Sequence, residues 1–271
     1  MFSTDRTAAQ VWCVDLDITP DLDQLVATLS QDERVRAKGF AFERDRNRFI
    51  AARSALRSIL AAWVGIPAEE LEFEYGTRLK PALAPWCRVA DLRFNLSHSK
   101  GCALVALTHG HEIGVDVEQA RHIDDAHAIV TREFSDGDRA AFEALPLEER
   151  SEAFIHAWVR KEAFLKATGE GLHRSLADIE VTFAPHEAAR ILAVSGDYSA
   201  SERWSMSSLM PRSGYIGAIV AEAPVVELVL HSFQELQNRR AEPLSVDPSD
   251  RKCRERIIGG PQPRGQASTA R

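Results

Sequence analysis

Residues 49–52 read Phe-Ile-Ala-Ala and residues 154–157 read Phe-Ile-His-Ala, and this repeat decides the fold. Each copy lies in a helical pattern that is followed by a short alternating run, at 71–73 and at 179–181. Each copy then continues into apolar, strand-like segments. Because a matched order of elements is harder to produce by chance than matched identities, the repeat predicts an α+β fold of two similar lobes related by a pseudo-twofold axis.

The repeat also sets the expected domain boundaries. We expect an N-terminal lobe over residues 1–115, a C-terminal lobe over 116–224 and a terminal strand or helix over 225–240. Residues 241–271 are rich in Pro, Gly and Arg and lose the apolar periodicity, which predicts a disordered tail. A ligand site is expected at the seam between the two lobes.

Local patterns place the elements of the lobes. A long helix is predicted at 45–64, where Gly65 and Pro67 end it, and the main helix of the second lobe at 148–168, where Gly169 ends it. Ser135 is the predicted N-cap of a helix between them. Strands are predicted at 11–16, 71–75 and 92–96, and a hairpin is predicted from 102–108 and 113–117 around the turn 109–112.

Composition excludes several classes of protein. The 271 residues are 45% hydrophobic and 27% charged, which is enough apolar material for a sizeable core. The formal net charge of −7 argues against general nucleic-acid binding, which needs clustered Lys and Arg. We find no membrane-spanning stretch or signal peptide and expect a cytoplasmic protein. The four scattered cysteines (Cys13, Cys87, Cys102 and Cys253) are expected to be packed thiols.

Two carboxylates share one face of the predicted strand at 113–118. Asp116 and Glu118 alternate with Val115 and Val117, so the strand period of two puts both acids on the same side. Such a pair repels itself unless a cation answers it, and Mg²⁺ suits it. The alternative is that the strand ends here and both carboxylates point into water.

The main helix of the second lobe carries Glu162 and Lys166 at the edge of its apolar face. At this spacing a glutamate and a lysine also form an ordinary stabilising helix pair, which by itself indicates no function.

Two further features could bind an anion. Residues 94–101 open from a strand into small polar residues around Ser97 and His98, although a lone histidine is more often a hydrogen-bonded turn residue. A basic run includes Arg36, Arg48 and Arg53, with Lys80-Pro81 beyond it; solvated helix faces commonly look like this. The pair His109-x-His111 has metal-like spacing but lacks a third partner.

The order and wording of these segments closely resemble one family. The residues that carry the resemblance are the stretches Phe-Asn-Leu-Ser-His-Ser at 94–99, Ile-Gly-Val-Asp-Val-Glu at 113–118, Trp158-x-x-Lys161-Glu162-Ala163-x-x-Lys166 and Gly169-x-Gly171-Leu172. They are similar to the 4′-phosphopantetheinyl transferases of the surfactin-synthetase-activating type. The resemblance covers about residues 11–222.

The resemblance implies transfer of the phosphopantetheine arm of coenzyme A to a serine of an acyl or peptidyl carrier protein, with Mg²⁺ or Mn²⁺ as cofactor. The implied metal ligands are Asp116, Glu118 and Glu162, and the implied catalytic residues are Glu162, Lys166 and Asp116. Glu162 would accept the serine proton directly or through a metal-bound water, and Lys166 would neutralise the departing phosphate. The implied coenzyme-binding residues are Arg36, Arg48, Arg53, Lys80, Pro81, Ser97, His98, Lys161 and Lys166.

The carrier is expected to dock near residues 121–134, on an apolar patch of Ile123, Ile129, Val130 and Phe134 rimmed by Arg121 and Arg132. Two internal lobes make a monomer the simplest expectation, with no nucleic acid or membrane as partner. Two rivals stay open, a coenzyme A-binding module without turnover and a phosphohydrolase that uses water as nucleophile. The full set of acids and Lys166 favours the transferase.

Overall fold

The computed structural model describes residues 8–18, 21–76, 80–87, 91–222, 227–234 and 236. The chain divides into a compact unit, Met1–Glu235, and a second unit, Leu236–Arg271. The predicted tail at 241–271 and Cys253 lie outside the described residues. Among the described residues, no helix combines the length and the apolarity that a membrane crossing needs.

Two series of elements follow one another within the first unit. The first series contains β1 (Ala8–Asp15), α1 (Leu22–Ala27), α2 (Gln31–Lys38), α3 (Glu43–Val64), β2 (Phe73–Tyr75), β3 (Pro81–Leu83), β4 (Leu92–Ser99) and β5 (Cys102–His109). The second contains β6 (Ile113–Gln119), α4 (Ala126–Glu133), α5 (Asp136–Glu143), α6 (Arg150–Thr168), β7 (Ile179–Val181), β8 (Ile191–Val194), α7 (Ala200–Arg203), β9 (Trp204–Leu209) and β10 (Tyr215–Glu222). A last strand, β11 (Glu227–Ser232), follows.

The two series repeat one topology. Each begins with a strand, continues through short helices to a long one, forms a small two-stranded hairpin and ends in a longer hairpin. The last strand of each hairpin returns to pair antiparallel with the first strand of its own series, β5 with β1 and β10 with β6. The predicted α+β fold with two similar lobes is therefore confirmed.

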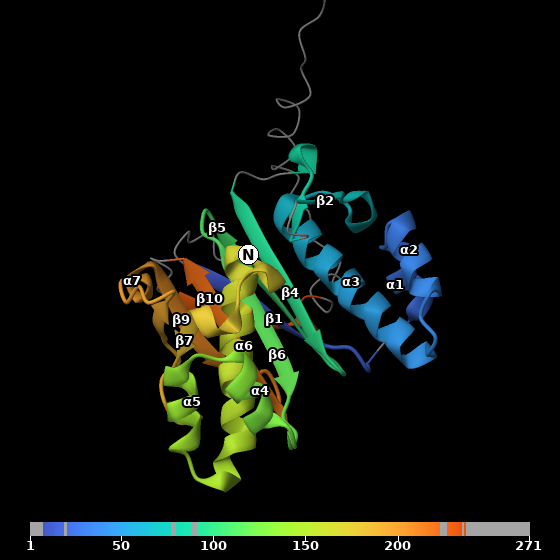
Figure 1. Ribbon diagram of the computed structural model, residues 1–271. Coiled ribbons are helices and arrows are strands. Elements are labelled where there is room, and N and C mark those ends of the chain that lie inside the picture. Colours follow the sequence, from blue (N-terminus) through green and yellow to red (C-terminus); the bar gives the residue numbers. More distant parts are fainter. Residues whose placement is uncertain are drawn as a thin grey trace, which may run out of the picture. The chain divides into compact units, whose positions relative to one another are not determined.

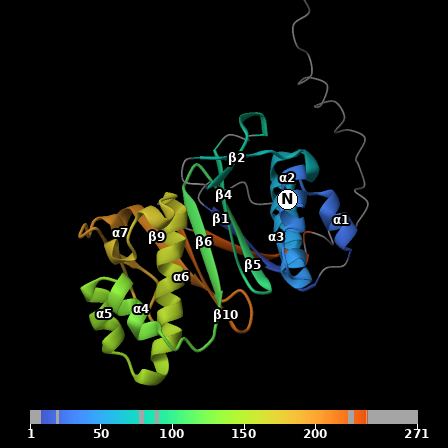
Figure 2. The same ribbon diagram turned by 45° about the vertical axis from the view of Figure 1, so that its right-hand side comes forward.

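The lobes are stacked as layers. The chain forms the sheet β11-β1-β5-β4 and the sheet β6-β10-β9, and Figures 1 and 2 show α3 to the right of β4 and α6 to the left of β6. Alternation of side chains explains the layering. Val11 and Leu104 of the first sheet and Val115 and Ile219 of the second fill the core between the sheets.

The predicted hairpin of residues 102–108 and 113–117 is wrong. β5 pairs with β1 and β4, whereas β6 pairs with β10 in the other sheet. Gly110, at φ 77°, turns the chain from one sheet to the next. The hairpin here is instead β4 with β5, joined at Lys100-Gly101, where Lys100 adopts φ 49°.

The last strand distinguishes the two lobes. β11 lies parallel to β1, on the edge away from β5. The corresponding edge of β6, away from β10, has no strand of its own sheet and faces β4. Among the described strands, the repeat creates two equivalent strand edges, one on β1 and one on β6. β11 pairs with the edge of β1, whereas the edge of β6 is left to be contacted by side chains of β4.

Helix ends follow the sequence signals. Gly65 and Gly169 adopt the left-handed conformation after α3 and α6, as predicted. Ser135 caps α5 by accepting a hydrogen bond from the backbone N–H of Asp138, and the carboxylate of Asp138 bonds back to the Ser135 backbone. The boundaries predicted for these three ends are confirmed.

Buried His156 on α6 predicts a pH dependence of stability. The side chain is 5% exposed, its Nδ1 has no described partner, and burial followed by the charge of Arg160 lowers its pKa to about 4. The unfolded chain binds this proton near pH 6.5 and the folded chain does not, so the free energy of unfolding falls as pH drops from about 6.5 to 4. The loss should be about 3 kcal/mol.

The prediction is checked by urea unfolding at pH 7 and pH 5, with His156→Leu as the test variant. Its unfolding free energy should depend less on pH than that of the wild type. His186→Leu, at an exposed position, is the control. An unchanged slope in His156→Leu would contradict the assignment.

Candidate active site

The candidate site lies where β4 and β6 face each other, and residues 95–99 and 115–119 are called the seam below. The strands belong to different sheets, and side chains join them. The backbone N–H of Val115 donates to Asn95 Oδ1 at 2.9 Å, and that of Gln119 donates to Ser99 Oγ at 3.3 Å. Side-chain oxygens of β4 thus satisfy N–H groups at the edge of β6.

Asp116 is the centre of the seam. Ser97 Oγ donates to its Oδ1 at 2.7 Å, and Lys166 Nζ lies 2.5 Å from the same oxygen. Lys166 also donates to Ser97 Oγ at 2.8 Å. The side chain of Asp116 is buried, and Oδ2 receives no hydrogen bond from the described residues. Three of the candidate residues, Asp116, Ser97 and Lys166, are therefore in direct contact.

Gly114 explains why α6 comes close enough. Gly114, Asp116 and Glu118 share the face of β6 that packs on α6. A Cβ at Gly114 would lie 2.1 Å from the carbonyl oxygen of Ala163 and 2.2 Å from the backbone nitrogen of Ala167. Only glycine allows this approach, which sets Lys166 against Asp116.

Glu162 adds a third carboxylate from α6. Burial raises its pKa, the negative charges of Asp116 and Glu118 raise it further, and Lys166 opposes them. Lys166 forms an ion pair with Asp116 across the seam. Among the described contacts it forms none with Glu162, so these two residues are not an ordinary stabilising helix pair. The three acids act on one another electrostatically and would gain from a cation.

The donor set fits a hard divalent cation. Carboxylate oxygens are the ligands that Mg²⁺ prefers, and the buried Oδ2 of Asp116 is an acceptor that its protein neighbours leave unused. Among the described residues, no group of three or more His, Cys, Asp or Glu is assembled closely enough to form a ready-made metal site. The acids are thus brought to one seam without forming a closed cage.

His98 and Arg36 lie on the other side of β4. His98 follows Ser97, so its side chain points to the face of the sheet that α3 covers. Burial by neighbours lowers the pKa of His98, and the positive charges of Lys166 and Arg36 lower it further. The guanidinium of Arg36 packs over the ring of Phe49, 5.4 Å from its centroid. Burial and the nearby cations thus disfavour the charged form of this imidazole.

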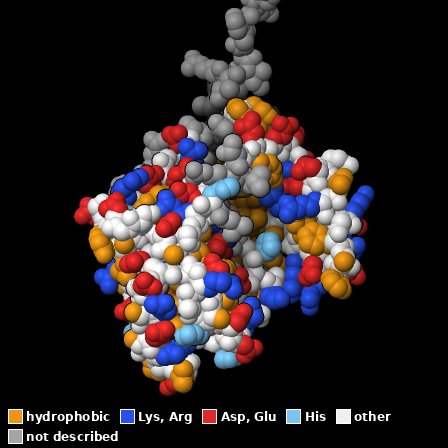
Figure 3. All heavy atoms as spheres, in the orientation of Figure 1, with side chains coloured by type: hydrophobic (Ala, Val, Ile, Leu, Met, Phe, Trp, Pro, Cys, Tyr) orange, Lys and Arg blue, Asp and Glu red, His pale blue; other side chains and the backbone are white. Residues whose placement is uncertain are grey.

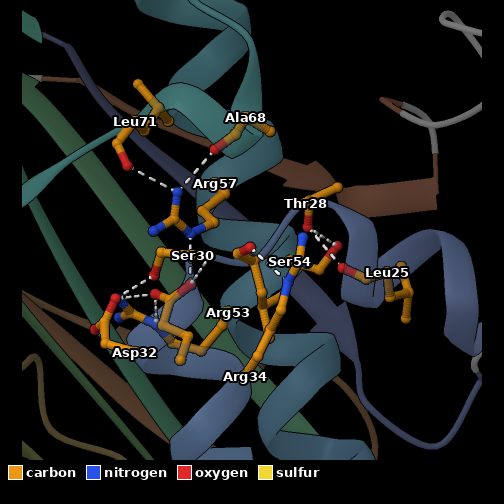
Figure 4. A network of polar contacts seen from close by, with 12 residues as sticks. Leu25, Thr28, Ser30, Asp32, Arg34, Arg53, Ser54, Arg57, Ala68 and Leu71 are labelled. Atoms are coloured by element: carbon orange, nitrogen blue, oxygen red, sulfur yellow. Dashed lines mark hydrogen bonds and ion pairs between the residues drawn. The ribbon is translucent and has the colours of Figure 1, made fainter.

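Arg53 and Arg57, both labelled in Figure 4, share one carboxylate, that of Glu33 on α2. Arg57 is buried and also donates to the carbonyls of Ala68 and Leu71, both at 2.8 Å. The buried guanidinium of Arg57 thus has an anionic partner, as a buried charge requires. Two guanidinium groups against one carboxylate leave an excess positive charge in this part of the molecule.

Arg48 is also held by an internal partner. Its Nε and Nη2 donate to the two carboxylate oxygens of Asp17 at 2.7 and 3.0 Å. Asp17 in turn packs against Gly101, where a Cβ would lie 2.2 Å from its Oδ2. Figure 3 shows blue side chains gathered over the part of the surface where α2 and α3 lie in Figure 1.

Lys80 joins the lobes. Its Nζ donates to Glu112 Oε2 at 2.8 Å, to the carbonyl of Ile113 at 3.1 Å and to the carbonyl of Ala167 at 2.9 Å. These three bonds engage the whole ammonium group, which ties the end of α6 to the start of β6. Coenzyme contact by Lys80 stays a prediction, as does contact by Pro81 at the start of β3.

The structure places Lys161 differently from the prediction. The predicted coenzyme contact is wrong, because its side chain is 0% exposed and its Nζ bonds to Asp138 and to the carbonyls of Leu176 and Ile179. One residue of α6 turns a side chain by about 100°, which puts Lys161 in the core of the second lobe while Glu162 faces the seam.

The predicted docking patch is partly wrong. Val130 and Phe134 are buried in the core of the second lobe, so they present no surface. Ile123 and Ile129 instead line a pocket of about 260 Å³, which Glu118 connects to the seam. Its other lining residues are Gln119, Arg121, Asp125, Phe154, Ile155 and Trp158. Arg132 pairs with Glu133 beside it and does not line the pocket.

Ser99, Asn95 and Asp17 are contributors that the sequence reading missed. The period of two along residues 95–99 could have found the first two, because it places Asn95, Ser97 and Ser99 on one face. No sequence signal links Asp17 to Arg48. The three cysteines within the described residues are free thiols.

The fold and the seam together define a class of protein. Two repeated α+β lobes hold acidic side chains and a lysine at one seam, with a basic face on the neighbouring helices. Such a site suits a polyphosphate ligand that is held through a divalent cation.

Comparison with known proteins makes the class specific. Residues 112–220 match the model of the 4′-phosphopantetheinyl transferase superfamily, and residues 17–109 match that of the 4′-phosphopantetheinyl transferase N-terminal domain. The chain is 36% identical over 210 residues to the 4′-phosphopantetheinyl transferase HetI of Nostoc sp.. The matched segment covers 77% of this chain and 85% of HetI.

Two Bacillus proteins are also similar. The chain is 31% identical over 163 residues to the 4′-phosphopantetheinyl transferase psf-1 of Bacillus pumilus, across 60% of this chain and 67% of psf-1. It is 26% identical over 162 residues to the 4′-phosphopantetheinyl transferase Sfp of Bacillus subtilis, across 59% and 68%. The chain therefore belongs to the 4′-phosphopantetheinyl transferase superfamily and is a transferase enzyme, which confirms the resemblance of its motifs.

Proposed function

We propose that this chain transfers the 4′-phosphopantetheine moiety of coenzyme A to a serine of an acyl or peptidyl carrier protein, with Mg²⁺ as cofactor. The serine oxygen forms a bond to the β-phosphorus of the pyrophosphate, the bond from that phosphorus to the bridging oxygen breaks, and adenosine 3′,5′-bisphosphate leaves. The observation that carries the proposal is the cluster of Asp116, Glu118, Glu162 and Lys166 at one seam of a chain that belongs to this family.

In this proposal Asp116, Glu118 and Glu162 hold the cation. When bound, Mg²⁺ neutralises the pyrophosphate and orients it for in-line attack. Asp116 contributes Oδ2, since its Oδ1 already accepts from Ser97 and Lys166. The mutual repulsion that raises the pKa of Glu162 supports a cation between these acids.

Glu162 is the proposed base that takes the serine proton. Burial raises the pKa of this carboxylate, and such a group takes up a proton more readily than an ordinary glutamate, which suits this step. Lys166 has three N–H groups and uses two of them on Asp116 and Ser97. The third can donate to a phosphate oxygen and stabilise the charge that the leaving group gains.

The basic face of the first lobe is the proposed nucleotide site. His98 and Arg36 are close enough for their charges to interact, and a phosphate between them would raise the pKa of His98 and make it a charged donor. Arg53 and Arg57 add positive charge that Glu33 only partly offsets. Arg48 contributes from the start of α3, held by Asp17.

The pocket beside Glu118 is the proposed place for the carrier. It is lined by apolar side chains from α4 and α6, including Ile129 and Trp158, with Arg121 among its polar residues. The carrier serine must come close to the carboxylates of the seam, and Glu118 belongs to both pocket and seam. We expect an apolar side chain next to that serine to enter the pocket.

Ile129→Asp should therefore raise KM for the carrier about tenfold, because it puts an unpaired charge into an apolar contact. KM for coenzyme A should stay unchanged. Leu230→Asp, on the exposed surface of β11, is the matched control and should alter neither constant. Equal carrier KM in Ile129→Asp and in the wild type would rule out docking at this pocket.

The function itself is tested by incubating the protein with coenzyme A and Mg²⁺, with and without an apo carrier protein. Transfer adds about 340 Da to the carrier serine. Release of the bisphosphate without a carrier would indicate a phosphohydrolase, and coenzyme binding without either product would indicate a binding module.

A further inference from the structure

The inference concerns Ser99, the last residue of β4, and it rests on the proposed function. Asn95, Ser97 and Ser99 alternate along β4 and face β6. Each meets a polar group of β6 in register: Asn95 accepts from the N–H of Val115, Ser97 donates to Asp116, and Ser99 donates to Glu118. The three side chains form a polar ladder in the place where a sheet would have backbone bonds.

Ser99 makes two bonds with β6. Its Oγ donates to Glu118 Oε2 at 2.6 Å and accepts from the backbone N–H of Gln119 at 3.3 Å. The second bond orients the first, because the hydroxyl that accepts from one strand residue is held in place to donate to the next. Ser99 is thus bound to the backbone of β6 and fixes one carboxylate oxygen of Glu118 relative to that backbone.

Glu118 depends on this contact. Its side chain is partly exposed at the end of β6, and among the described residues Ser99 is the one that donates a hydrogen bond to its carboxylate. Asp116, by comparison, is buried and held by both Ser97 and Lys166. The side chain of Glu118 has one more rotatable bond than that of Asp116 and one hydrogen-bond partner fewer. Its carboxylate is therefore less firmly oriented than that of Asp116.

We propose that Ser99 is a positioning residue that directs the Glu118 carboxylate toward the divalent cation. The bond engages Oε2 and leaves Oε1 available as a ligand, on the face of β6 that Glu118 shares with Asp116. Ser99 acts through Glu118 and touches neither the coenzyme nor the carrier. Hydrogen-bond partners of metal-binding carboxylates typically change metal affinity by 10- to 100-fold when they are removed.

The test compares Ser99→Ala with Ser99→Thr in the full chain. Mn²⁺ binding is measured by calorimetric titration in the presence of coenzyme A, and transfer to a carrier is measured across a range of Mg²⁺ concentrations. Ser99→Ala should bind Mn²⁺ about 10- to 100-fold more weakly and need correspondingly more Mg²⁺ for half-maximal rate. At saturating Mg²⁺ its kcat should lie within a few-fold of the wild type, with KM for coenzyme A unchanged.

Ser99→Thr keeps the hydroxyl and should restore Mn²⁺ affinity. Ser205→Ala is the matched control, because it removes a half-buried strand hydroxyl that bonds to the carbonyl of Ala221 at 3.2 Å, away from the seam. It should bind Mn²⁺ as the wild type does. Thermal unfolding of all variants separates a loss of metal affinity from a loss of folding.

Two outcomes overturn the proposal while leaving the proposed function standing: Mn²⁺ affinity in Ser99→Ala equal to that of the wild type, or a weakened affinity that Ser99→Thr shares. A wild-type protein that transfers no phosphopantetheine or binds no Mn²⁺ with coenzyme A would instead overturn the proposed function, and this inference with it.

Discussion

Asp116→Asn should lower kcat for carrier modification by about 10²- to 10³-fold or more. The substitution keeps the size of the side chain and removes its charge. Lys166 and Ser97 then lose the anion to which they donate. The seam also loses the negative charge on Oδ2, the buried oxygen that is the proposed ligand of the cation. The measurement is the rate of carrier mass gain at saturating coenzyme A and Mg²⁺.

The loss should be chemical and not a failure to fold. Lys166 is partly exposed and can be solvated when Asp116 is neutral, so the thermal midpoint should shift little. Asp136→Asn is the control, since it removes an exposed carboxylate that pairs with Arg139 at 3.1 Å. A kcat within threefold of the wild type in Asp116→Asn would contradict the central role of this residue.

Gly114→Val should reduce the free energy of unfolding by more than about 3 kcal/mol. Its Cβ would meet backbone atoms of α6 at Ala163 and Ala167, which cannot move aside as a flexible side chain would. Either α6 shifts outward or the chain fails to fold, and in both cases Lys166 leaves Asp116. The measurement is urea unfolding at pH 7, together with the transfer rate.

Gly76→Ala is the control for this change. Its Cβ would meet no atom of the described residues within 4 Å, and its backbone is not in the left-handed region. We expect its unfolding free energy to change by less than about 0.5 kcal/mol. If Gly114→Val were as stable as Gly76→Ala, the close contact of β6 with α6 could not be what sets the seam.

The positions of the long helices could be predicted because their signals are local. A glycine in the left-handed conformation ends α3 and α6, and the serine that caps α5 bonds within three residues of itself. The prediction of a hairpin from 102–108 and 113–117 was wrong because strand pairing is not a local property. Local alternation predicts that a strand exists, but the partner of β6 is β10, about a hundred residues away along the chain.

The site was predicted in the same uneven way. The strand period places Asp116 and Glu118 on one face, the helix period places Glu162 and Lys166 on one edge of α6, and Lys166 contacts Asp116. Lys161 shares the same motif but points into the core. A motif gives the spacing of residues, whereas the direction of each side chain depends on what packs against its element.

The sequence by itself determined the two repeated lobes, the ends of the long helices, the residue types at the seam and the family. These follow from local periodicity, capping and motif wording, which need no knowledge of distant contacts. Only the tertiary structure decided that β4 faces β6, that β11 covers the equivalent edge of β1, and that Ser99 holds Glu118. Each of these is a contact between residues far apart in the chain, and its geometry is fixed by close packing of whole sheets and helices.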